Sequence, residues 1–206
     1  MRYQTRHLFL LGFLIHTVLF SQTGPGGVGS SSNNKLWLDG NRGVTLSGSS
    51  VTNWADQSGN GFTAVPSSTA ARPTYVTSSI NGYPSLDFDG SNDELWINDN
   101  AAFDVTQWHF FIVPMVDNAK DYNAWFCKGN DGQENFEMLS YSTNNVHTPI
   151  YYTDATRTSP STASAQVGAS PCIIEYSYSS SVGRDVYKNN SNINTDNENK
   201  TPSTNN

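Results

Sequence analysis

The stretch CIIEYSYS, residues 172–179, decides the fold class of this chain. Ile174, Tyr176 and Tyr178 recur at every second position, and the residues between them are polar. Successive side chains of an extended strand point to opposite faces, so this alternation predicts a β-strand with one buried face. The same reasoning applies to several other parts of the chain.

Short stretches rich in Val, Ile, Thr and aromatic residues recur between Gly, Asn, Ser and Pro. They are 35–39, 51–55, 73–77, 85–89, 94–98, 108–116, 123–128, 135–141, 149–153, 172–179 and 184–188. No helical apolar period lasts longer than about two turns. These features predict an all-β fold, a two-sheet antiparallel sandwich. The strand pattern alone leaves open whether it is a jelly roll or an immunoglobulin-like sandwich.

The first residues have the pattern of a secretory signal peptide. Arg2 and Arg6 precede the apolar run 8–20, and the small residue Ser21 follows it. That run of 13 residues is shorter than the ~20 needed to cross a bilayer. We therefore expect residues 1–21 to be a signal peptide. The mature protein is then secreted, to the extracellular space or the cell surface, and has no membrane span.

The net charge limits which partners the chain can bind, and its two cysteines limit which disulfides it can form. Loss of the two signal-peptide arginines moves the net charge from −7 to −9. Such an acidic chain is poorly suited to nucleic acid, because few cations are present to displace phosphate counterions. Cys127 and Cys172 either pair in a disulfide or remain buried thiols, and the sequence leaves both alternatives open.

The composition divides the mature chain into three parts. Residues 22–34 form a Gly/Ser/Asn-rich stretch, which predicts a flexible leader. Residues 35–188 carry the candidate strands. Residues 189–206 are rich in Asn and hold one large apolar residue, Ile193, so we expect a polar tail or loop there.

Several motifs in combination resemble the LamG-like, concanavalin A-like jelly-roll domains of secreted bacterial surface proteins. They are LWLDG (36–40), WADQSGNGFTA (54–64), GYPSLDFDGSNDEL (82–95), WHFFIV (108–113), KGNDGQENFEMLSY (128–141) and VGRDVYKN (182–189). The resemblance implies a jelly-roll sandwich over 35–188 that ends with a glycine-rich turn and a further strand. Nothing of that kind follows Thr201, so we expect the jelly roll to be incomplete at its C-terminus.

The resemblance extends to glucanases, which makes a glycoside hydrolase an alternative function. A retaining glycosidase needs two carboxyl groups ~5 Å apart. The nearest pairs here are Asp87 with Asp89 and Glu134 with Glu137, and no Glu-x-Asp-x-Glu strand occurs. Zinc-ligand spacing, a serine nucleophile elbow and a phosphate-binding loop do not occur either. The sequence therefore favours a non-catalytic protein.

A calcium site is one binding hypothesis. Read from Asp56, the stretch D-x-S-x-N-G copies the first six positions of an EF-type loop, but Ser67 stands where the bidentate Glu is needed. An EF-hand is therefore excluded. A Ca²⁺ site at the sandwich rim would use Asp56 and Asn60 together with Asp89 and Asp93. The alternative is that Asp56 and Asn60 hydrogen-bond to their own turn.

Carbohydrate binding is the second hypothesis. Sugar sites pair an aromatic ring with carboxylates and amides. The candidate rings are Trp96, Trp108, Trp125 and Tyr152, although aromatic residues at alternate strand positions are often core residues. The sequence thus predicts a module for carbohydrate or cell-surface recognition and adhesion, and a purely structural adhesin repeat is the third alternative. The oligomeric state stays open.

Overall fold

A computed structural model describes most of the chain beyond its first residues. The described residues are 24, 29–117, 123–129, 135–141, 145–158 and 161–204. The predicted signal peptide, residues 1–21, lies outside them. Within the described part, no helix has the length and apolarity needed to span a bilayer.

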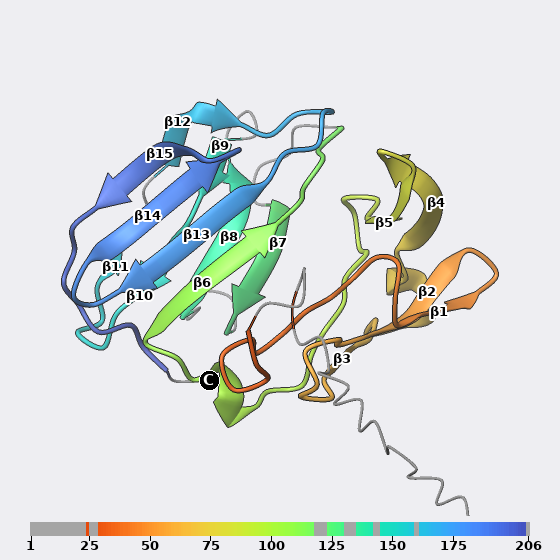
Figure 1. The fold of residues 1–206 in the computed structure, drawn as a ribbon, viewed down its shortest axis with the longest axis horizontal. Coiled ribbons are helices and arrows are strands. Elements are labelled where there is room, and N and C mark those ends of the chain that lie inside the picture. The colour runs from red at the N-terminus through yellow and green to blue at the C-terminus, as the bar shows by residue number, and fades with distance from the viewer. Residues whose placement is uncertain are drawn as a thin grey trace, which may run out of the picture.

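The first sheet is formed by the N-terminal strands, in the spatial order β1-β2-β4-β5 with β3 paired to β2. Its strands are β1 Val44–Ser47, β2 Ser50–Ala55, β3 Thr63–Ala64, β4 Thr74–Ile80 and β5 Tyr83–Asp87. Two short 3-10 helices, η2 Thr69–Ala71 and η3 Ala101–Phe103, lie in the same part of the chain. In Figure 1 this sheet lies to one side of the other two.

The second sheet has four strands in the order β15-β14-β13-β6. The strands are β6 Gln107–Ile112, β13 Ile174–Ser179, β14 Gly183–Lys188 and β15 Ser191–Asp196. All neighbours are antiparallel, and β13 pairs along its whole length with both β6 and β14.

The third sheet faces the second one (Figure 1) and is built around β8. Its strands are β7 Asn123–Lys128, β8 Phe136–Tyr141, β9 Asn145–His147, β10 Ile150–Tyr151, β11 Arg157–Thr158 and β12 Ser161–Gln166. β7 pairs with one edge of β8, and β9 and β10 follow one another along the other edge. β12 and β11 lie outside β9 and β10.

The main hydrophobic core lies between the second and third sheets. Ile174, Tyr176 and Tyr178 of β13 are all buried, whereas the residues between them are only half-buried. They pack with Phe136, Met138, Val146, Ile150, Val167 and Val186. The structure thus confirms the all-β antiparallel sandwich, with three separate sheets where the sequence predicted two.

Two hairpin turns contain consecutive residues with positive φ. Asn81 and Gly82, with φ of 53° and 82°, connect β4 to β5. Asn189 and Asn190, with φ of 49° and 66°, connect β14 to β15. Two-residue hairpin loops favour this conformation because its twist matches that of the strands, and Asn and Gly adopt it most readily.

Some of the predicted elements are wrong. Residues 35–39 form no strand, and within 94–98 only Trp96 makes a bridge. Six strands were not predicted, namely β1, β3, β9, β11, β12 and β15.

β15 lies within the segment expected to be a polar tail or loop. It forms because the Asn189-Asn190 turn folds it back on β14, and Ile193 packs against the core. The two cysteines are not joined in a disulfide.

Candidate functional site

Trp96 is the most exposed of the four candidate rings, with 51% of its surface accessible. It lies in an extended segment opposite Val65, and the two residues exchange backbone hydrogen bonds of 2.9 and 2.7 Å. Directly paired residues project from the same face of an antiparallel ladder. The exposed Val65 side chain and the Trp96 ring therefore share one surface.

A carboxylate is fixed on this surface. Glu94 stands two residues before Trp96 in the extended segment, so both side chains project from the same face. The Ser67 hydroxyl donates a hydrogen bond to Oε1 of Glu94 and continues the register set by Val65 and Trp96. The backbone N–H of Glu94 donates to the carbonyl of Ala71 at 3.1 Å, which anchors the segment.

These residues define a surface that we name the Trp96 face: Val65, Ser67, Glu94, Trp96 and the exposed Asn98. An exposed indole can stack on the apolar side of a sugar ring, while carboxylate and amide groups hydrogen-bond its hydroxyls. The Trp96 face therefore combines the groups that a carbohydrate site requires.

The other ring candidates have less exposed positions. Trp108 is 8% exposed, and its ring lies 4.5 Å from that of Phe136 and 5.1 Å from that of Tyr178. Tyr152 is 3% exposed, and its hydroxyl lies 3.0 Å from the Thr158 hydroxyl. Trp125 is half-buried and packs against the core. None of these three rings is gathered with Trp96 into one platform.

The DQSGNG turn, residues 56–61, holds the segment that precedes the first sheet. Oδ1 of Asp56 accepts hydrogen bonds from the backbone N–H groups of Trp37 and Ser58, each at 2.8 Å. Its Oδ2 accepts from the Ser58 hydroxyl at 2.6 Å, and Ser58 is fully buried. Both carboxylate oxygens thus accept hydrogen bonds from the protein, and the bond from the Ser58 N–H is that of an Asx turn.

The Asn60 side chain, like that of Asp56, hydrogen-bonds to the segment that precedes the first sheet. Its amide nitrogen donates to the carbonyls of Ser31 and Asn34 at 3.0 Å and of Lys35 at 3.1 Å. These bonds fix part of the predicted flexible leader. They also show why 35–39 forms no strand, since the polar groups around it pair with this turn.

Asp89 and Asp93 lie in a second turn and bond to each other's backbone. Oδ1 of Asp89 accepts from the N–H groups of Ser91, Asn92 and Asp93 at 2.8, 3.2 and 3.4 Å. Oδ2 of Asp93 accepts from the N–H of Asp89 at 3.0 Å. Within the described residues, no three His, Cys, Asp or Glu side chains gather closely enough to hold a metal ion.

These contacts favour the interpretation of all four residues as turn residues. Both oxygens of Asp56 already accept hydrogen bonds from the protein, so a Ca²⁺ ion there would have to share or replace these bonds. The calcium hypothesis stays a prediction, to be tested by the melt described below.

No family model, no curated protein and no solved structure matches this chain. The structure shows an all-β antiparallel sandwich, and the LamG-like resemblance stays a prediction from the motifs.

Two features escaped the sequence reasoning. The Ser67–Glu94 pair joins residues far apart in the sequence, and only the Val65–Trp96 bridge brings them together. Arg184 is 1% exposed, although charged residues are seldom buried. One signal could have found it, because Arg184 alternates with Val186 in a predicted strand and therefore projects to the same side.

Proposed function

We propose that this protein is a secreted, non-catalytic module of the LamG-like, concanavalin A-like type that recognises carbohydrate through the Trp96 face. The observation that carries the proposal is the half-exposed indole of Trp96, held rigidly by two backbone hydrogen bonds beside a fixed carboxylate. A rigid aromatic group loses little conformational freedom when it binds, so its stacking contributes efficiently to affinity.

The electrostatics of the protein favour a neutral glycan at this face. The chain carries a formal net charge of −7, and Glu94 adds a carboxylate to the face itself. Carboxylates accept hydrogen bonds from sugar hydroxyls but repel anionic groups. We therefore expect neutral oligosaccharides to bind here more tightly than sulfated or carboxylated ones.

The proposal is tested by glycan binding with the full chain and two variants, each lacking one exposed aromatic side chain. Neutral oligosaccharides from plant and bacterial cell walls are screened on an array, and the best one is titrated by calorimetry. Trp96→Ala should weaken its binding by about tenfold or more, which corresponds to about 1.4 kcal/mol. Phe111→Ala is the matched control, because Phe111 is also an exposed aromatic residue, at 65%, on a different sheet.

An unchanged affinity in Trp96→Ala would show that the Trp96 face is not the binding surface. Failure of every glycan to bind would instead favour the structural adhesin repeat. Cleavage of an oligosaccharide during the titration would favour the glucanase-like alternative.

A further inference from the structure

Arg184, on β14, is a cation inside the sandwich. Its side chain is 1% exposed, Nη2 donates to Thr158 Oγ1 at 2.8 Å, and Nη1 lies 3.7 Å from Oδ2 of Asp196. Nε and Nη1 meet no hydrogen-bond acceptor among the described residues. Buried donors without acceptors are costly, and a guanidinium pairs best with a carboxylate through two N–H groups. This end of the sandwich therefore favours a further carboxylate.

Arg184 belongs to a row of side chains that crosses the sheet from strand to strand and includes aromatic residues. The strand register places Trp108, Tyr178, Arg184 and Asp196 opposite one another in turn. The Trp108 and Tyr178 rings are stacked, and the buried indole N–H of Trp108 has no acceptor in the described part of the chain. The row combines ring faces, N–H donors and one cation.

The tyrosine hydroxyls at this end are neutral. Burial raises the pKa of Tyr176, against smaller lowering effects from Arg184 and Trp108. Burial likewise raises the pKa of Tyr152 and of Tyr178. Neutral phenols can donate hydrogen bonds to an acidic ligand, whereas phenolates would repel it.

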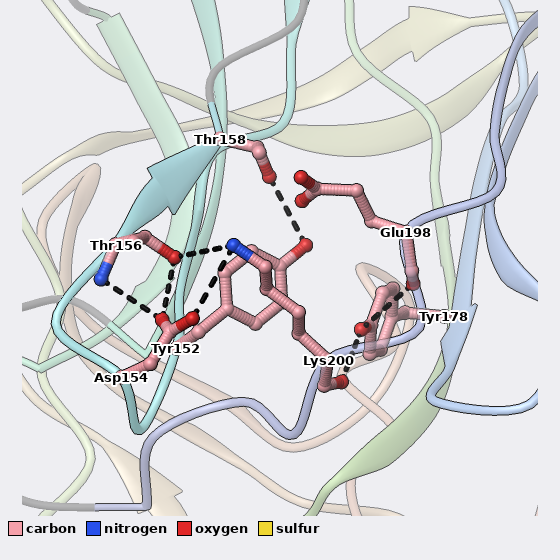
Figure 2. Close-up of polar contacts among 7 residues, drawn as sticks. All are labelled: Tyr152, Asp154, Thr156, Thr158, Tyr178, Glu198 and Lys200. Atoms are coloured by element: carbon pink, nitrogen blue, oxygen red, sulfur yellow. Dashed lines mark hydrogen bonds and ion pairs between the residues drawn. The ribbon is translucent and has the colours of Figure 1, made fainter.

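Residues 197–203 cross this end of the sandwich, and we name them the strap (Figure 2). The Tyr178 hydroxyl donates to the backbone carbonyls of Glu198 and Lys200 in the strap. At the other sheet, Thr153 N–H donates to the Thr201 carbonyl at 3.0 Å, and Ser203 N–H donates to the Tyr151 carbonyl at 2.8 Å. The strap therefore covers Tyr152 and Tyr178.

A lysine fastens the strap from outside. Nζ of Lys200 lies 3.3 Å from Oδ2 of Asp154 and donates to the Thr156 hydroxyl at 2.8 Å. It also lies 5.4 Å from the centre of the Tyr152 ring. Exposed ion pairs of this kind are weak, so Lys200 adds little to the hydrogen bonds that Tyr151, Thr153 and Tyr178 make to the strap.

Glu198 is a residue of the strap whose carboxylate is partly buried. Oε2 of Glu198 is buried and meets no hydrogen-bond donor among the described residues. In Figure 2 the Glu198 side chain extends toward Thr158, whose hydroxyl also accepts the hydrogen bond from Arg184. A carboxylate oxygen without a donor and a buried cation with unused donors thus belong to the same end of the sandwich and do not pair with each other.

We propose that the Arg184 end of the sandwich is a second binding site, for the carboxylate of a uronic acid, and that the strap, with the partly buried Glu198 carboxylate, covers it in the closed state. The ligand carboxylate pairs with the unused N–H donors of Arg184, and the lifted strap exposes the Tyr152 and Tyr178 rings to the sugar. The site is separate from the Trp96 face and does not depend on the function proposed for it.

Glucuronate, glucose and acetate are titrated into the full chain by calorimetry at physiological ionic strength, where long-range repulsion by the acidic surface is screened. Glucuronate is expected to bind and glucose is not, because they differ in the carboxylate. Glu198→Gln removes a carboxylate charge that would repel the ligand carboxylate at this end, and should tighten glucuronate binding about fivefold or more, a coupling of ordinary size. Glu175→Gln is the control, since Glu175 lies on β13 and pairs with His109 instead.

Two further variants test the anchor of the site. Arg184→Lys keeps the charge but loses the forked donors, and Thr158→Val removes the acceptor that positions Nη2. Both should weaken glucuronate binding in the Glu198→Gln background, with circular dichroism confirming that each variant is folded.

Glucose binding as tightly as glucuronate would overturn the proposal, because the carboxylate would then not be recognised. Acetate binding as tightly as glucuronate would reduce the site to a small-anion site and overturn the sugar assignment. An affinity unchanged by Glu198→Gln would overturn the role of the strap. Absence of glucuronate binding to Glu198→Gln would exclude the site altogether.

Discussion

The N-terminal sheet and the sandwich keep their shape in different ways. The sandwich buries a continuous cluster of aliphatic and aromatic residues between two sheets. In the N-terminal region, Val51, Ala64 and Ala71 are the buried hydrophobic residues among those described, while Val65, Tyr83, Phe88 and Trp96 are exposed. Hydrogen bonds from the DQSGNG turn contribute there what hydrophobic burial contributes in the sandwich. The exposed aromatic residues of the N-terminal region therefore lie where polar turns hold the backbone in place.

The comparison is sharpest between two tryptophans. Trp108 is 8% exposed and contacts four other rings, whereas Trp96 is 51% exposed at an isolated bridge. Both were candidates for stacking on a sugar. The same side chain therefore contributes to stability in one region and is available for recognition in the other.

Trp108→Ala is expected to have the largest effect. Removing a buried indole leaves a cavity that the surrounding rings fill only in part, so the free energy of unfolding should fall by about 3–5 kcal/mol. Urea unfolding followed by circular dichroism measures the loss. A loss below about 1 kcal/mol would show that the core tolerates the cavity and would remove the contrast with Trp96.

Asp56→Ala should have an intermediate effect. The change leaves the N–H groups of Trp37 and Ser58 and the Ser58 hydroxyl without their acceptor, at a cost of about 1–3 kcal/mol. Asp56→Asn keeps an acceptor oxygen and should cost less. An equal loss for the two substitutions would mean that charge, and not the turn hydrogen bonds, stabilises this region.

Calcium gives a second measurement on the same turn. Because both oxygens of Asp56 already accept hydrogen bonds, we expect the Tm of the full chain to be the same in chelator and in millimolar calcium. A higher Tm in calcium that Asp56→Ala abolishes would establish the rim site instead, since a ligand that prefers the native state stabilises it.

Trp96→Ala should change stability very little. The half-exposed ring adds little to the buried core, so we expect a change within about 0.5 kcal/mol, as for most surface substitutions. Its effect should be on glycan affinity. A large loss of stability would assign Trp96 to the packing of the N-terminal region and weaken its proposed role in recognition.

The smallest effect is expected from Asp154→Asn, which loosens the strap. The Thr156 hydroxyl, followed by its backbone N–H and by Lys200, lowers the pKa of the Asp154 carboxyl below its usual 3.8. Because this pKa is lower in the folded state than in the unfolded state, the ionised Asp154 carboxylate stabilises the fold at pH values above the unfolded-state pKa. That stabilisation is lost as pH falls through the folded-state pKa. Wild type should therefore exceed Asp154→Asn slightly in stability at neutral pH, and the difference should vanish in acid. A difference that persists once the Asp154 carboxyl is protonated in both the folded and the unfolded state would contradict this assignment.

Much of the sandwich could be predicted from local pattern. Alternation in 172–179 identified the buried face of β13, and the predicted strand at 123–128 matches β7. These stretches are apolar enough to show their period without knowledge of their neighbours. The signal for β15 was weaker, because Ser191–Asp196 is polar and depends on the Asn189-Asn190 turn for its position.

The sequence by itself determined the all-β class, the antiparallel pairing and the polar character of the turns, because side-chain alternation and backbone preferences are local properties. Only the tertiary structure decided which aromatic ring faces solvent, because exposure depends on what packs above each strand. The same holds for the Ser67–Glu94 pair, the burial of Arg184 and the position of Glu198 over that end of the sandwich. Each joins residues from separate strands or segments, and strand pairing brings them together in space.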